Sequence, residues 1–206
     1  MTIFLLSWFS VMFALVFSPG PANVLLMVSG ASQGFKKSLR VVAGIDLIFL
    51  LQSIALGYGL FEVLQKNPKL AFYIQLLGIL YLFKIAWGFL PRNDERDVLA
   101  ENNIGFKRAA LLQVLNAKGW ALVILMFSLF LSPAQELWGE NATIVLLLML
   151  AGLNVSIHIG WALVGAFLGQ LFHSNQSKVM LSYAFFIILS ITGFWMLVDL
   201  LVSHRF

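Results

Sequence analysis

The chain has 206 residues, of which 61% are hydrophobic and 11% charged, with a mean hydropathy of +0.93 and a formal net charge of +4 at pH 7. A soluble domain is roughly 45–50% apolar and about 25% charged, so this composition excludes a soluble enzyme, a disordered tail and a nucleic-acid-binding protein. The chain has no cysteine, which excludes disulfides, thiol nucleophiles and thiolate metal ligands. The composition predicts a multi-pass protein of the lipid bilayer.

Six apolar stretches follow one another along the chain, each long enough for a membrane crossing of about 20 residues. They run near residues 2–32, 39–61, 70–90, 109–131, 142–172 and 178–203. Backbone polar groups in lipid must be satisfied internally, and the period-two alternation of a membrane β-barrel is absent from the sequence. The sequence therefore predicts an all-α membrane protein with about six transmembrane helices.

The first stretch contains a break at Ser18-Pro19-Gly20-Pro21-Ala22-Asn23. Two prolines around a glycine remove two N–H donors and clash with the preceding turn, so a regular helix cannot continue. The break lies about 12 residues, or about 18 Å, from the end of the stretch, and carbonyls freed at that depth must face protein or a water-filled cavity. Pro19, Gly20, Pro21 and Asn23 are therefore candidates to line a substrate path; the alternative is a packed kink.

The second stretch carries one acidic residue, Asp46, about two turns from its start. An ionisable residue within a membrane helix indicates a functional site by default, so Asp46 is a candidate for proton coupling. The alternative is an interfacial residue at the start of the helix. Gln52 is expected to join helices by hydrogen bonding.

The fourth stretch offers a second break at Leu115-Asn116-Ala117-Lys118-Gly119. Lys118 lies about ten residues past Arg108, about 15 Å deep, where a cation costs from about 3 kcal/mol upward. Asn116 and Lys118 are therefore further candidates for the path, unless Lys118 extends its stem to the headgroups. Half-helices that begin after the two breaks would direct N–H dipoles at one central point, which suits an anionic group.

A zwitterionic amino acid would suit such a site. Its carboxylate would meet the N–H donors, and its ammonium group would need acceptors such as Asn23, Asn116, Asp46 or freed carbonyls.

His158 in the fifth stretch is a second candidate for proton coupling, because imidazole changes its charge near neutral pH. The alternative is a hydrogen-bonded packing residue, and Asn154 is expected to join helices in the same way as Gln52. Tryptophans are expected to anchor the bundle at the membrane interfaces. These are Trp8, Trp87, Trp138 and Trp195.

The connector at 91–108 divides the single membrane domain, residues 1–206, into two halves of three helices, 1–90 and 109–206. Residues 43–57 and 151–165 match at a shift of 108, and the match pairs Asp46 with Asn154. A duplicated unit of three helices must enter the membrane in the opposite orientation. Inverted repeats of this kind are typical of secondary transporters with a site near the midplane.

Positive charges are unevenly distributed between the connectors. Three lie on one side, at Lys66, Lys69 and Arg205. Eight lie on the other, at Lys36, Lys37, Arg40, Arg92, Arg96, Lys107, Arg108 and Lys178. Since positively charged connectors stay in the cytoplasm, connector 91–108 is expected there and both termini outside.

Four segments resemble the LysE/RhtB family of bacterial amino-acid exporters, and most resemble its cysteine/O-acetylserine branch. They are SPGPAN in the first helix, GFKKSLRVVAG after it, GILYLFKIAWGFL in the third and QVLNAKGW in the fourth. The resemblance implies proton-motive-force-driven efflux of a small neutral amino acid across the bacterial inner membrane, of the cysteine, O-acetylserine, homoserine or threonine type. It also implies that Pro19, Gly20, Pro21, Asn116 and Lys118 line or shape the path.

The chain departs from the family pattern at two points. The usual Asn-Pro-Lys is Asn116-Ala117-Lys118 here, so the second break should be softer than the first. The usual Gly-Asp after the glycine matching Gly44 is replaced by Ile48-Phe49. A coupling role for Asp46 is therefore inferred from its charge and depth.

Three other classes of function are alternatives. An intramembrane enzyme lacks its usual motifs here. A transporter of another small solute or a divalent cation on the same scaffold would need acidic clusters for the cation, and a non-transporting scaffold remains open. The sequence predicts no cofactor, no metal and no nucleic-acid partner; it predicts an amino acid, a proton and lipid as partners, and leaves homo-oligomerisation open.

Overall fold

The computed structural model describes residues 1–60, 67–90, 104–171 and 175–203. These residues form helices and no strand, which confirms the all-α prediction for this part of the chain. The helices are α1 (Thr2–Phe17), α2 (Pro21–Gln33), α3 (Phe35–Ala55), η1 (Leu56–Leu60), α5 (Pro68–Gly88), α7 (Phe106–Val114), α8 (Ala117–Trp138), η2 (Gly139–Asn141), α9 (Ala142–Leu171) and α10 (Asn175–Ser203). Most of the connector predicted at 91–108 lies outside the described residues, as do Lys66 and Arg205.

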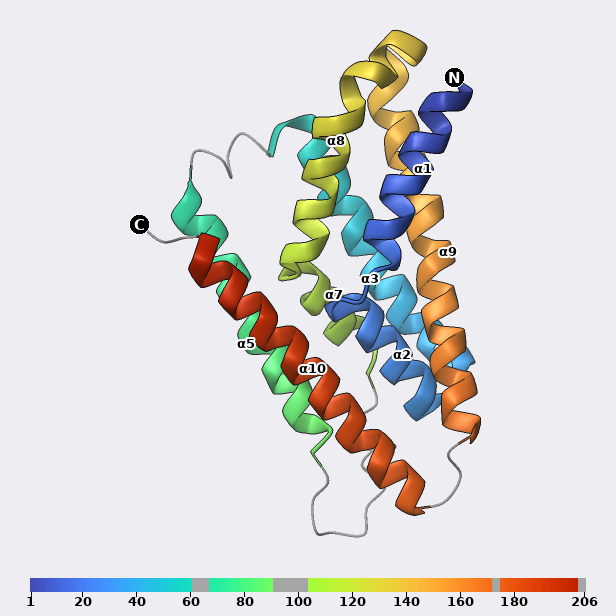
Figure 1. Cartoon of the computed structure of the whole chain (residues 1–206), viewed down its shortest axis with the longest axis vertical. Coiled ribbons are helices and arrows are strands. Elements are labelled where there is room, and N and C mark those ends of the chain that lie inside the picture. The colour runs from blue at the N-terminus through green and yellow to red at the C-terminus, as the bar shows by residue number, and fades with distance from the viewer. Residues whose placement is uncertain (61–66, 91–103, 172–174, 204–206) are drawn as a thin grey trace.

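Three helical segments of the described chain are long and apolar enough to cross a membrane, or four if the bent pair α1 and α2 counts as one span. One of the three, Ala117–Leu171, contains both α8 and α9, which run in opposite directions from a turn at the top of Figure 1. The apolar part of α5, Leu76–Gly88, is shorter. The chain is thus a helical membrane protein, and the number of six crossings stays a prediction.

The helices form an elongated bundle with one pair set at an angle to the rest (Figure 1). Helices α1 and α2 follow one another down the molecule with a bend of 60° at Ser18–Gly20. Helix α9 packs along α2, and α3 lies behind them against α7 and α9. Helices α5 and α10 pack together as the tilted pair.

Small residues allow the closest helix contact, between α2 and α9. A Cβ atom added at Gly30 would overlap the Ala162 carbonyl oxygen, and one added at Gly165 would overlap the Met27 carbonyl oxygen. Close approach through small residues is the usual packing mode of membrane helices, which lack a hydrophobic driving force between them. The turn into α3 needs only Gly34, whose φ of 78° favours glycine.

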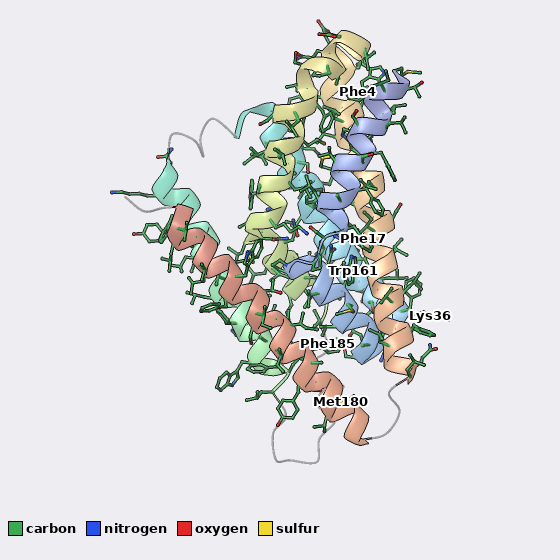
Figure 2. All side chains as sticks on the ribbon, in the orientation of Figure 1. Phe4, Phe17, Lys36, Trp161, Met180 and Phe185 are labelled. Carbon is green, nitrogen blue, oxygen red and sulfur yellow. The ribbon has the colours of Figure 1, made fainter. Side chains whose placement is uncertain are left out.

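Two clusters of buried side chains make up the interior. One contains Leu25, Ile45 and Phe185, from α2, α3 and α10; the other contains Met12 and Val123, from α1 and α8. In Figure 2 Phe17, the last residue of α1, lies beside Trp161 of α9, with ring centroids 5.7 Å apart.

The interfacial assignment of Trp8 is wrong. Trp8 is 3% exposed and belongs to the second cluster, because Trp8, Met12 and Val16 share one face of α1 at a spacing of four residues. Trp87 and Trp195 are 62% and 63% exposed, and their place at the membrane interface stays a prediction.

Two helix boundaries differ from the sequence prediction. Helix α3 begins at Phe35 instead of residue 39, so Asp46 lies about three turns into it. Helix α8 continues through Pro133 to Trp138 instead of ending at 131. A membrane helix tolerates such a proline where neighbouring groups satisfy the freed carbonyl.

Candidate functional site

The first break is stabilised by side chains that replace the missing backbone donors. Pro19 has no N–H for the Leu15 carbonyl, and the Ser18 hydroxyl donates to that carbonyl instead (2.8 Å). The Asn23 amide nitrogen donates to the carbonyls of Val16 (2.7 Å) and Ser18 (3.0 Å). Asn23 is 3% exposed. Its two hydrogen bonds connect the start of α2 to the end of α1 inside the protein.

Lys118, the second residue of α8, reaches the first break. Its Nζ donates a hydrogen bond to the Ser18 carbonyl. A Cβ atom added at Gly20 would lie 2.7 Å from Lys118 Cδ and 3.1 Å from Nζ. Gly20 has an extended backbone that any residue can adopt, so its role is to leave room for the lysine stem. Lys118 thus turns into the bundle.

The second break, at Leu115 and Asn116, is braced by three buried amides. Asn116 Nδ2 donates to Gln113 Oε1 (3.0 Å), and Gln113 Nε2 donates to Gln52 Oε1 (2.9 Å). Gln52 Nε2 returns a hydrogen bond to the Gln113 carbonyl (3.0 Å) at the end of α7. The interruption is two residues long, against three at the first break. Gln52 therefore joins α3 to α7, as predicted.

Asp46, Asn154 and His158 form a third polar group, between α3 and α9. Asp46 Oδ1 accepts from Asn154 Nδ2 (2.7 Å) and lies 2.6 Å from His158 Nδ1. The side chains of His158 and Asp46 are 5% and 12% exposed. A carboxylate beside a ring nitrogen fixes the orientation of a histidine ring, so Asp46 holds the His158 side chain in place.

The two breaks and this group meet around a small cavity of about 30 Å³. That volume holds about two water molecules and is smaller than an amino acid. Five predicted site residues line it: Gly20, Asn23, Asn116, Lys118 and His158. Val16, Phe49 and Leu122 from one hydrophobic cluster and Ala22 from the other complete much of its wall.

Asp46 and the two prolines do not line this central cavity. Asp46 lines a second cavity of about 240 Å³ between α3 and α9, with Ala43, Leu47 and Ala151 among its neighbours. Pro21 is buried as the first residue of α2, and Pro19 is exposed. The prolines therefore shape the break, while Gly20 and Asn23 line the cavity.

Gln113 and Phe49 are among the residues of the central cavity that were not predicted from the sequence. Gln113 lies three residues before Asn116, at the end of α7, but its role depends on Gln52 from another helix, so the sequence alone does not reveal it. Phe49 carries no chemical signal in an apolar helix. Within the described ranges, no group of three or more histidine, aspartate or glutamate side chains could hold a metal ion.

Comparison with known proteins gives a consistent result. A sequence profile described as LysE type translocator matches residues 13–198. The cysteine/O-acetylserine efflux proteins of Escherichia coli strain K12 and of Shigella flexneri serotype 5b strain 8401 are each 28% identical to this chain over 169 residues. Each match covers 80% of this chain and 85% of the relative. No solved structure matches.

Proposed function

Because the chain belongs to the LysE-type translocator family, we propose that it exports a small neutral amino acid or derivative from the cytoplasm. The proposed cargo is of the cysteine, O-acetylserine, homoserine or threonine type. The relatives named as cysteine/O-acetylserine efflux proteins support the first two. The central cavity supports a neutral amino acid as cargo.

The observation that carries the proposal is the meeting of two helix breaks around Lys118 inside an apolar bundle. A cation at this depth is costly, and its hydrogen bond to the neutral Ser18 carbonyl does not balance its charge. A cargo carboxylate would balance it. No acidic side chain lines the central cavity in the described chain, which favours a neutral zwitterion over lysine or arginine.

Export by this site requires the bundle to open and close. A cavity of about 30 Å³ is too small for an amino acid, so the helices around it must move apart before cargo can bind. The helical hydrogen-bond pattern is already interrupted at both breaks. The helix segments can therefore change their angle there without losing helical hydrogen bonds. Alternating access around a fixed central site follows.

We propose that Asp46 and His158 couple export to proton entry. His158 lines the central cavity and Asp46 the second one, and the 2.6 Å contact joins them. A proton that reaches Asp46 from the second cavity can pass to His158 beside the cargo. Proton and amino acid would then use separate openings and meet at His158.

The relation between Asp46 and Asn154 supports two inverted halves. These residues are equivalent under the shift of 108, and their side chains are hydrogen-bonded to each other (2.7 Å). Equivalent residues touch where a two-fold axis passes between two copies. We propose that this axis relates 1–90 to 109–206, in a bacterial inner membrane with both termini in the periplasm.

The experiment that tests export uses a bacterial strain without its own exporters of these amino acids. Cells that express the chain are loaded with dipeptides, and the amino acids released into the medium are measured over time. We expect release above empty-vector cells, and loss of that release in Lys118→Ala and in Pro21→Ala. Unchanged release in both variants would refute the site, and no release by the natural chain would favour the scaffold alternative.

Coupling is tested separately with purified protein in liposomes. Uptake of labelled amino acid is measured with the lumen one pH unit more acidic than the outside, and exchange is measured without a gradient. We expect Asp46→Asn and His158→Gln to abolish the gradient-driven accumulation and to retain exchange. Accumulation that survives in both variants would contradict the coupling role while leaving export intact.

A further inference from the structure

We propose that the side-chain amide oxygens of Asn23 and Asn116 bind the α-ammonium group of the cargo, so that a free, protonated α-amine is a condition of transport. This inference rests on the proposed function and divides its site into a carboxylate end at Lys118 and an ammonium end at the two asparagines. Two features support this site: the orientation of each asparagine amide and the partners of the neighbouring acceptors.

The orientation of the Asn23 amide is fixed by its own hydrogen bonds. Its nitrogen donates to the Val16 and Ser18 carbonyls, at 2.7 and 3.0 Å. Two carbonyl oxygens cannot donate, so the nitrogen of Asn23 must be on that side and the oxygen on the other. That oxygen is buried and has no hydrogen-bond partner among the residues that the structure describes.

Asn116 at the second break repeats the arrangement. Its nitrogen donates to Gln113 Oε1 (3.0 Å), and Gln113 is itself oriented because its nitrogen donates to Gln52 (2.9 Å). The Asn116 oxygen is likewise buried and without a partner in the described part of the chain. Asn23 and Asn116 are 3% and 5% exposed, and both line the central cavity.

A buried acceptor without a donor is costly, so such groups are rare and call for an explanation. Two of them beside one cavity are explained if the cargo supplies the donors. An ammonium group has three N–H donors and no acceptor, which matches a pair of oxygens. The two oxygens accept from the ammonium group without adding a charge to the site.

The other acceptors near the cavity are either engaged or lie outside it. The Ser18 carbonyl accepts from both Asn23 and Lys118. Asp46 Oδ1 lies against Asn154 and His158, and its Oδ2 is buried without a partner in the described chain, but Asp46 lines the second cavity and not the central one. Among the side-chain acceptors that the sequence suggested, the two asparagine oxygens are the pair that belongs to residues lining the central cavity.

The test compares amino acids that differ only in whether the amine is free. O-acetyl-L-serine and N-acetyl-L-serine are isomers, and L-cysteine, L-homoserine and L-threonine are each paired with their N-acetyl derivative. Each compound competes for uptake of the best-carried labelled amino acid into liposomes that contain the full chain. We expect the free amines to compete at least tenfold better than their N-acetyl partners.

Variants test whether this preference for the free amine depends on the two asparagines. Losing one hydrogen bond to a charged group corresponds to about ten- to hundredfold weaker binding. We therefore expect Asn23→Ala and Asn116→Ala to weaken binding of the free amino acid by that factor and to leave binding of the N-acetyl compound unchanged. The preference for the free amine then falls. Asn116→Gln, which keeps both an amide donor for Gln113 and an oxygen acceptor, should keep more of the preference than Asn116→Ala. Ser38→Ala removes a buried hydroxyl outside the cavity and serves as the control.

The outcomes separate this inference from the proposed function. Equal competition by both members of each pair, or an unchanged preference in both alanine variants, overturns the ammonium site and leaves amino-acid export standing. Failure of the natural chain to carry any of the four amino acids overturns the proposed function and this inference with it. A variant that binds both members of a pair less well by the same factor also counts against the inference, since it shows a general loss of the site.

Discussion

The ammonium group of Lys118 donates a hydrogen bond to the backbone carbonyl of Ser18, a residue 100 positions earlier in the chain. The contact joins the first break to the second, and it crosses from one half of the sequence to the other. A carbonyl oxygen carries no net charge, so it satisfies one donor of the ammonium group without balancing its charge. The lysine is thus held in place and remains able to bind an anion.

We expect Lys118→Met to abolish transport and to leave the protein as stable as before or more stable. Methionine has a similar length and carries no charge, so the desolvation cost of a buried cation, from about 3 kcal/mol upward, is removed. Thermal unfolding in detergent and uptake into liposomes measure the two effects. The matched control is Lys84→Met, because Lys84 is an exposed lysine on α5.

Opposite results would show that Lys118 is structural. A melting temperature that drops in Lys118→Met, together with transport that survives in the folded fraction, would mean that the hydrogen bond to Ser18 mainly holds the two breaks together.

Gly20→Ala should reduce transport without unfolding the protein. The added Cβ would lie 2.7 Å from Lys118 Cδ, and a flexible lysine stem can move away, so we expect a stability loss of less than about 1 kcal/mol. The moved lysine would lose its position beside the cavity. Transport and thermal unfolding are compared with those of Gly152→Ala, where an added Cβ meets no described atom within 4 Å. Transport equal to that of the Gly152 control would contradict the role of Gly20.

The first break could be predicted from the sequence because its cause is local. Pro19 and Pro21 remove donors whatever surrounds them, and α2 begins at Pro21. A lysine about 15 Å deep needs a purpose in any fold, and Lys118 turns into the bundle. The burial of Trp8 could not be predicted, since the other helices determine which face of α1 turns inward.

The contacts between distant helices could not be derived in the same way. Asp46 and His158 are 112 positions apart, and each was predicted as a candidate for proton coupling. The sequence of either helix alone does not show that the two side chains are in contact. Their contact depends on how α3 and α9 are rotated and shifted, which small residues along α2 and α9 help to set. The bracing role of Gln113 was missed for the same reason, because Gln52 comes from another helix.

The packing of α2 on α9 predicts a sharp difference between two glycines of one helix. An added Cβ at Gly165 overlaps the backbone carbonyl of Met27, and backbone cannot move aside as a side chain can. Gly165→Ala should therefore lower the unfolding free energy by about 1–3 kcal/mol. Gly160→Ala, on the same helix with open space around it, should be neutral or slightly stabilising, because alanine is the better helix former. Equal melting temperatures for the two variants would contradict the close α2–α9 contact.

The amide pair of Gln52 and Gln113 gives a double-mutant test of the second break. Gln52→Leu leaves the Gln113 amide nitrogen without its partner and should cost about 1–3 kcal/mol of unfolding free energy, the penalty of a buried unpaired group. Gln113→Leu leaves Gln52 Oε1 without its donor and should cost a similar amount. The double variant removes both partners, so its cost should be clearly below the sum of the single costs. Thermal or chemical unfolding in detergent measures all four proteins, and additive costs would mean that the two amides act independently and that the second break is held by other contacts.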